Sequence, residues 1–251
     1  MSEAEINLVS DSFFQTTAAE EMPIPAPEDI EKVNKATPNQ LVHLKSLTEG
    51  HNSRKYLFIR ECFGPLFKTI INLADNNNAC VTGDPGIGKS AFSYYVFLRL
   101  VNQLKTDTKA AIYHVGIGGS VLCWRNQGFE YHQSLPDSNW VYPDSWLLLD
   151  GWAPIRFAEK RQRAIVFTSP KRENYHQLIK QNGVIFGMPP WSKDEILKFA
   201  GELPAAERKR IQSSWVAALG DRNETALESL DSDDELSICM MGLFFWLVNI
   251  P

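Results

Sequence analysis

Apolar residues along this chain are grouped into short runs, and polar, glycine-rich or proline-rich segments separate the runs. Four runs have the length and composition of strands that are buried on both faces of a parallel sheet. They lie at residues 79–82, 110–115, 146–150 and 163–168. A longer apolar run begins at Ala91, directly after the first strand and its glycine-rich turn, and predicts a helix. Strands that alternate with helices in this way predict an α/β fold with a mainly parallel sheet.

Weaker patterns predict the remaining elements. A hairpin around Gly128 is indicated by two short apolar runs, and a further strand by a third; they lie at 120–124, 129–134 and 184–187. Ser192 is a helix N-cap residue with Glu195 at the capping-box position, which predicts a helix over 193–200. Other helices are expected at 40–71 in front of the sheet, at 173–181 and at 205–219.

The chain divides into three regions by composition. Residues 1–38 contain four prolines and many acids but little apolar periodicity, which predicts a flexible leader. Residues 39–200 hold the strands and form the expected core domain. Residues 201–251 are predicted to form a helical C-terminal segment, interpreted as a truncated lid. Its apolar run at 236–250 is shorter than a membrane span requires, so we expect a buried helix and no membrane span.

The turn after the first strand has the full Walker A pattern, G-x-x-x-x-G-K-S. Its three glycines permit positive φ angles, so that backbone N–H groups can line a concave site at the start of the helix, where phosphates bind. The lysine adds a charge between the β and γ phosphates, and the serine a hydroxyl ligand for Mg²⁺. The pattern predicts an ATP and Mg²⁺ site, whose nucleotide-binding residues are Gly83, Asp84, Pro85, Gly86, Ile87, Gly88, Lys89 and Ser90.

Polar residues at two later strand ends complete the predicted site. Asp150 follows four apolar residues, as the acid of a Walker B segment does, and is expected to hold Mg²⁺ opposite Ser90. Thr168 and Ser169 end the next strand, where P-loop ATPases have a polar sensor, although turn and capping chemistry explains them equally well. Arg172 is the candidate sensor or finger arginine, and its alternative is a solvated residue at a helix start. The predicted catalytic residues are Lys89, Asp150, Thr168 and Arg172.

The order of the strands in the sequence predicts their arrangement. A strand at 110–115 separates the Walker A strand from the Walker B strand, so these two are not expected to be neighbours. This is the additional-strand class of P-loop NTPase, a three-layer α/β/α fold with the nucleotide at the carboxyl ends of the strands. A GTPase is less favoured, because the chain has no downstream N-K-x-D segment. His114 and His132 alternate with apolar neighbours and are interpreted as hydrogen-bonded strand residues.

The net charge and the cysteine content indicate which partners and which cellular compartment are expected. The 251 residues carry a net charge of −5, and glutamates dilute both basic clusters, at 156–163 and 208–210, so nucleic acid is not an expected partner. The four cysteines form no C-x-x-C pair and suit a reducing compartment. Residues 1–21 are acidic and polar, which predicts no signal peptide. An intracellular location is therefore expected.

Four stretches together resemble the NTPase domain of crinkler-type proteins. They are Phe58-Ile59-Arg60-Glu61-Cys62, the Walker A loop, Leu149-Asp150-Gly151, and Thr168-Ser169-Pro170 with Met188-Pro189-Pro190-Trp191-Ser192. That family is similar to trypanosome retrotransposon hot spot proteins, and distantly to AAA and signal-transducing ATPases. The resemblance covers about residues 56–200. It implies phosphate binding at 83–90, Mg²⁺ support at Asp150 and γ-phosphate sensing near Thr168 or Ser169; a location in a host cell or nucleus follows only where it extends to delivery.

Two functions remain open at this point. One is an Mg²⁺-dependent ATP hydrolase whose turnover drives a conformational change. The other is a nucleotide-gated switch or binding module with little or no hydrolysis, because Gly151 stands where many ATP hydrolases have a water-polarising acid. An arginine supplied by a second copy would make self-assembly part of the first function. The sequence specifies no other protein partner.

Overall fold

The fold is described from a computed structural model of the chain. The described residues are 24–45, 56–74, 78–116, 119–133, 145–151, 163–171, 175–180 and 182–209.

A seven-stranded sheet organises the structure, in the order β6-β5-β4-β7-β8-β3-β9. Five neighbouring strands are parallel, and β5 and β6 form an antiparallel hairpin at one edge, as the pattern around Gly128 predicts. The bounds are β3 Ala79–Thr82, β4 Ala111–Val115, β5 Val121–Arg125, β6 Gly128–His132, β7 Trp146–Asp150, β8 Arg163–Thr168 and β9 Val184–Gly187. The α/β fold with a mainly parallel sheet is therefore confirmed.

The strand order also confirms that the two motif-bearing strands are not neighbours. β8 lies between β3, which precedes the glycine-rich loop, and β7, which ends at Asp150. All three strands are parallel and nearly fully buried, as strands covered on both faces are. Their carboxyl ends consequently meet at one edge of the sheet.

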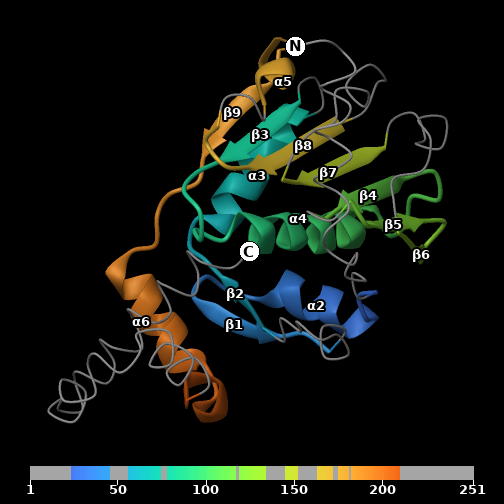
Figure 1. Ribbon diagram of the computed structural model, residues 1–251. Coiled ribbons are helices and arrows are strands. Elements are labelled where there is room, and N and C mark those ends of the chain that lie inside the picture. The colour runs from blue at the N-terminus through green and yellow to red at the C-terminus, as the bar shows by residue number, and fades with distance from the viewer. Residues whose placement is uncertain are drawn as a thin grey trace, which may run out of the picture.

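Helices cover both faces of this sheet, which is compatible with a three-layer α/β/α arrangement (Figure 1). On one face, α4 (Lys89–Leu104) packs beneath the strands together with α3 (Phe63–Ala74). On the other face, Leu178 of α5 (His176–Lys180) joins a second core with alternate residues of the same strands. The α5 helix lies inside the expected range of 173–181, of which residues 173, 174 and 181 fall outside the described residues.

The region expected to form a helix at 40–71 is mixed. Its first part forms an antiparallel pair, β1 (Gln40–His43) with β2 (Tyr56–Ile59), and α3 begins only at Phe63. The helix prediction is wrong at 40–43 and 56–59, because Leu57, Phe58 and Ile59 are all buried, so their apolar run lacks the polar face that a surface helix shows. Residues 46–55 lie outside the described residues. Short apolar runs of this kind fit a buried strand equally well, and packing decides between the two.

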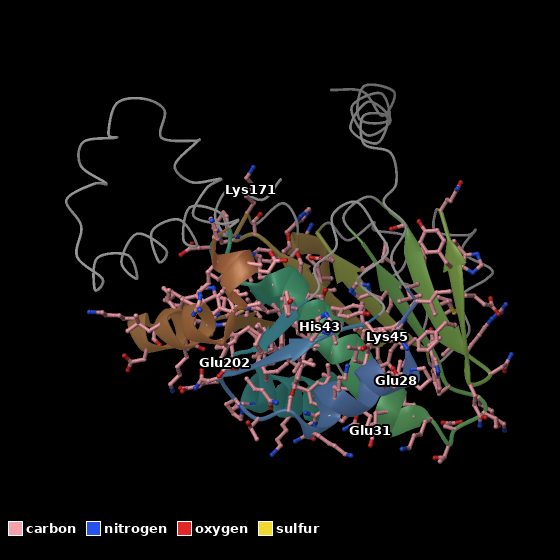
Figure 2. All side chains as sticks on the ribbon, turned by 90° about the horizontal axis from the view of Figure 1, so that it is seen from below. Glu28, Glu31, His43, Lys45, Lys171 and Glu202 are labelled. Atoms are coloured by element: carbon pink, nitrogen blue, oxygen red, sulfur yellow. The ribbon has the colours of Figure 1, made fainter. Side chains whose placement is uncertain are left out.

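A helix also forms within the range expected to be a flexible leader. The α2 helix (Pro27–Lys35) has proline at its first turn, acids near its start and lysines near its end, and these residues favour a helix. Val33 is fully buried in the core with α4. The Asp29 carboxylate accepts a hydrogen bond from the backbone N–H of Lys45, which ties α2 to the chain after β1. The Lys45 side chain also lies near that of Glu28 on α2, at 3.6 Å (Figure 2). Burial of Val33 therefore stabilises a segment whose composition predicts a leader.

The helix predicted after Ser192 is confirmed as α6 (Lys193–Glu202). Ser192 accepts from the backbone N–H of Glu195, and the Glu195 side chain accepts from the backbone N–H of Ser192, so the capping box is complete. Beyond α6, helical turns resume at residue 205, and the rest of the expected helix and the apolar run at 236–250 lie outside the described residues. Within the described ranges, no helix has the length and apolar character to cross a membrane.

Candidate functional site

The glycine loop, residues 83–90, joins the carboxyl end of β3 to the first turn of α4. All three of its glycines have positive φ angles: 154° at Gly83, 79° at Gly86 and 95° at Gly88. The predicted need for glycine at these positions is thus confirmed, since other residues seldom adopt such angles. Gly88 is the N-cap residue of α4, so the loop ends at free helix N–H groups with the positive end of the helix dipole.

Gly83 is also required by space. A Cβ atom on Gly83 would overlap the Ile87 side chain and would lie 3.0 Å from the backbone oxygen of Met188. Met188 N–H donates to the Thr82 oxygen at 2.8 Å, so the chain after β9 passes close beside the start of the loop. The loop is therefore packed tightly on the side that faces residues 188–191.

Lys89 folds back over the glycine loop. Its ammonium nitrogen donates to the backbone oxygens of Gly83 and Asp84, both at 2.8 Å. Burial lowers the pKa of Lys89, and the carboxylates of Asp150 and Asp84 oppose this shift. The structure thus brings Asp150 into electrostatic range of Lys89.

Asp150 and Thr168 stand at the same edge of the sheet as the loop. Asp150 ends β7 beside Phe167 of β8, and Thr168 ends β8 beside Thr82 of β3. Asp150 is half-buried and Thr168 is buried. Three of the four predicted catalytic residues therefore lie on adjacent elements around the loop, whereas Arg172 lies outside the described residues.

A buried hydrogen-bond chain stands behind the first turn of α4. The Ser93 hydroxyl donates to the backbone oxygen of Ser90 at 2.9 Å and lies 3.0 Å from Nε2 of His114. Burial lowers the pKa of His114 to about 4, so its ring is neutral near pH 7. The prediction that His114 is a hydrogen-bonded strand residue is confirmed. Ser93, the hydrogen-bond partner of His114, contacts Ser90, so His114 supports the turn that carries the candidate Mg²⁺ ligand.

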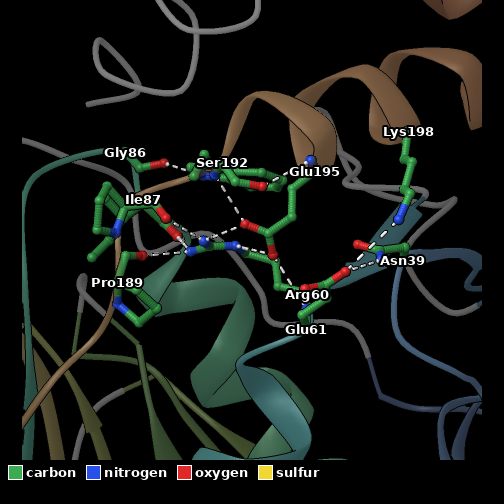
Figure 3. A network of polar contacts seen from close by, with 11 residues as sticks. Asn39, Arg60, Glu61, Gly86, Ile87, Pro189, Ser192, Glu195 and Lys198 are labelled. Atoms are coloured by element: carbon green, nitrogen blue, oxygen red, sulfur yellow. Dashed lines mark hydrogen bonds and ion pairs between the residues drawn. The ribbon is translucent and has the colours of Figure 1, made fainter.

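The outer side of the loop is held by Arg60, a residue whose role the motifs do not predict (Figure 3). Its guanidinium group donates to the backbone oxygens of Ile87 at 2.9 Å, Pro189 at 3.0 Å and Pro190 at 2.8 Å. It also pairs with both carboxylate oxygens of Glu195, at 3.3 and 2.8 Å. Arg60 is 1% exposed, so this is a buried ion pair.

Glu195 interacts both with the first turn of α6 and with the chain around Arg60. It completes the capping box of α6 and it also accepts from the backbone N–H of Glu61, directly after Arg60. Burial alone would raise the pKa of Glu195, but hydrogen bonds from Arg60 and two backbone N–H groups, together with the Arg60 charge, lower it. Arg60 alone has a sequence signal, because an arginine that directly follows the apolar run Leu57-Phe58-Ile59 needs a buried partner, whereas nothing local identifies Glu195 as that partner.

Trp191 packs against Arg60 beside the glycine loop. Its ring lies 4.5 Å from the Arg60 guanidinium carbon and stacks near Phe58, with ring centres 5.7 Å apart. Its indole N–H makes a long contact of 3.4 Å with the backbone oxygen of Gly86. The sequence connects residues 58–62 with residues 188–192 only through a family resemblance. In the structure the two segments are in contact through Arg60 and Trp191, and Glu195 holds Arg60 from the start of α6.

Comparison with known proteins places the chain near the crinklers. No protein-family model matches it. Over 222 residues it is 26% identical to crinkler effector protein 15 of Phytophthora infestans, which covers 78% of this chain and 34% of that protein. Over 172 residues it is 28% identical to crinkler effector protein 16 of the same organism, covering 61% and 26%. The chain is distantly homologous to crinkler effectors.

This homology confirms the crinkler part of the resemblance. The alignments span about a third and about a quarter of the length of the two relatives.

Proposed function

We propose that this chain binds ATP with Mg²⁺ at the glycine loop and hydrolyses it to drive a conformational change. The observation that carries the proposal is the conformation of residues 83–90. A strand, a turn with three positive-φ glycines and a helix N-terminus follow one another, and Lys89 lies across the turn. Loops of this form bind triphosphates through backbone N–H groups.

The residues around the loop have the chemistry that ATP and Mg²⁺ require. Lys89 is already placed on backbone oxygens inside the loop, and phosphate oxygens are stronger acceptors to which it can transfer its hydrogen bonds. Ser90 and Asp150 supply the hard oxygen ligands that Mg²⁺ prefers. Bound Mg²⁺ would neutralise charge on the phosphates. In this proposal Thr168 senses the γ-phosphate from the end of β8, between the loop strand and the Asp150 strand.

The resemblance to the crinkler NTPase domain favours the same assignment. The two relatives are described as crinkler effectors. We propose that this chain corresponds to their P-loop NTPase module, of the additional-strand class and distantly similar to AAA and signal-transducing ATPases. The order β9-β3-β8-β7-β4, with β8 inserted between the two motif strands, supports that class.

One observation favours the second candidate, a nucleotide-gated switch with little hydrolysis. Gly151 follows Asp150 with a φ of 110°, and its N–H donates to the Phe167 oxygen at 2.7 Å. The residue after Asp150 therefore has no carboxylate to polarise a water molecule, and its position is held by the next strand. In this alternative, ATP acts as a ligand that changes the conformation without rapid turnover.

Calorimetry with ATP and Mg²⁺, followed by phosphate release at steady state, tests both candidates. We expect wild-type chain to bind ATP, and Lys89→Ala to bind it about 100-fold more weakly, because a charge-assisted contact is lost. Lys105→Ala, which changes an exposed lysine just after the end of α4, is the matched control and should bind as wild type does. Turnover above about one per minute supports hydrolysis. Absence of ATP binding would refute both candidates.

A further inference from the structure

Arg60 uses every hydrogen it can donate. A guanidinium group has five N–H donors in a fixed plane. The Nε atom and the two Nη atoms of Arg60 make five hydrogen bonds, which end on two carboxylate oxygens of Glu195 and three backbone oxygens. Lysine has three donors on one atom and cannot reproduce this pattern. The site is thus specific for arginine at this position.

The three backbone oxygens belong to segments without regular secondary structure. Pro189 and Pro190 have no N–H groups and follow β9, and Ile87 belongs to the glycine loop. Buried backbone oxygens in such segments require partners from elsewhere. Arg60 supplies them, and it thereby joins the loop to the chain that leads into α6 (Figure 3).

The contact with Ile87 has a consequence for the opposite side of the loop. In a planar trans peptide, the C=O and the following N–H point in opposite directions. Because the Ile87 oxygen is held toward Arg60, the N–H of Gly88 must point away from Arg60. Gly88 is the N-cap residue of α4, and no cis peptide is found in the described residues. The orientation of one donor of the proposed phosphate site thus depends on Arg60.

Glu195 extends this dependence to α6. The carboxylate holds Arg60 with two contacts and at the same time caps the first turn of α6. The pair is almost completely shielded from water, with side-chain exposures of 1% and 6%. A displacement of α6 would therefore move the guanidinium group and, through it, the Ile87–Gly88 peptide.

We propose that Arg60 and Glu195 are a positioning pair that sets the backbone of the glycine loop and couples it to α6. The pair acts through the Ile87 oxygen and touches no reacting group. Its importance for nucleotide binding rests on the proposed function, whereas the positioning of the loop does not. The two claims can consequently be tested separately.

Hydrogen–deuterium exchange of the full chain without nucleotide tests the positioning. Arg60→Gln and Glu195→Gln should each raise exchange of peptides that contain residues 86–89 at least tenfold more than exchange of the β4 and β7 strands. Arg60→Lys should give an intermediate increase. The matched control is Arg125→Gln, which breaks the bidentate Arg125–Glu130 pair in the β5–β6 hairpin and should leave the loop unchanged.

The Glu195→Gln variant tests whether α6 is coupled to the loop. Glu195 lies on α6, and within the described residues its hydrogen bonds go to Arg60, Glu61 and Ser192 and not to residues 83–90. An equal rise in exchange across all peptides, or an unchanged loop, would overturn the proposal. Should Arg60→Gln fail to fold, Arg60→Lys and Glu195→Gln give the same decision. ATP titration of the same variants follows, with about tenfold weaker binding expected for Arg60→Gln. If wild-type chain binds no ATP, the proposed function fails while the exchange result stands.

Discussion

The glycine loop has an inner side, which Lys89 contacts, and an outer side, which Arg60 contacts, and different kinds of contact hold the two sides. On the inner side, Lys89 folds onto oxygens five and six residues before it, and the glycine φ angles are local properties. On the outer side, Arg60 reaches Ile87 across 27 residues and Glu195 across 135. The inner side is encoded within one short stretch, and the outer side depends on segments from three parts of the chain.

This difference predicts how substitutions on each side affect nucleotide binding and the stability of the fold. A substitution on the inner side removes a charge or a hydroxyl from a side chain that is partly exposed at the edge of the sheet, so the fold should tolerate it. A change on the outer side leaves a buried charge or several backbone oxygens without partners, which is costly in the folded state. Substitutions on the two sides should therefore separate loss of binding from loss of stability.

The largest effect is expected from Arg60→Met. Removing one partner of a buried ion pair costs about 3–5 kcal/mol of the free energy of unfolding, because Glu195 keeps a buried charge. The double variant Arg60→Met/Glu195→Met should recover part of this loss, since neither charge remains. Recovery is incomplete because Glu195 also caps α6. Urea unfolding at pH 7 measures both values.

The matched comparison for that prediction is Arg125→Met. This arginine makes the same bidentate contact with Glu130, but the two side chains are 22% and 39% exposed. We expect a loss of about 1 kcal/mol or less, because solvent weakens an exposed pair. Equal losses for Arg60→Met and Arg125→Met would show that burial does not distinguish the two pairs.

A second, smaller effect concerns acid stability behind the inner side. The pKa of His114 falls from 6.5 to about 4 on folding because the ring is buried. The unfolded chain therefore binds the proton first, and lowering the pH from 7 to 5 should cost the folded state about 2 kcal/mol through this residue. His114→Gln should lose about that much less between the same two pH values in urea unfolding.

His43→Gln is the control for the acid measurement, because His43 is exposed on β1. It should show the wild-type dependence on pH. A wild-type slope in His114→Gln as well would mean that the buried ring does not titrate between these pH values.

The smallest effect is expected from Asp150→Asn and tests the metal role on the inner side. If Asp150 holds Mg²⁺ with Ser90, ATP binding should weaken about tenfold in Mg²⁺, or about 1.4 kcal/mol, and change little in EDTA. Asparagine keeps the size and any capping contact, so the fold is preserved. Asp84→Asn, which removes the other carboxylate near Lys89, controls for charge alone. A loss of equal size with and without Mg²⁺ would contradict the metal role.

Sequence patterns predicted the central sheet better than its surroundings. The four main strands, the hairpin and the capped helix after Ser192 are confirmed, because their signals are local: buried apolar runs, a turn glycine and a capping box. The helix expected at 40–43 and 56–59 is wrong, and α2 forms where a leader was expected. Both differences arise from packing, since Leu57 and Val33 are buried against residues distant in the sequence.

By itself, the sequence determined the form of the glycine loop and the polar strand ends around it, because positive φ angles require glycine and parallel strands end at one edge. Only the tertiary structure decided that Glu195, a local capping residue by pattern, is also the partner of Arg60. The capping box explains Glu195 completely within four residues, so its second partner leaves no local signal. Burial supplies the missing constraint, because an arginine with five donors in the core must find acceptors wherever the fold provides them.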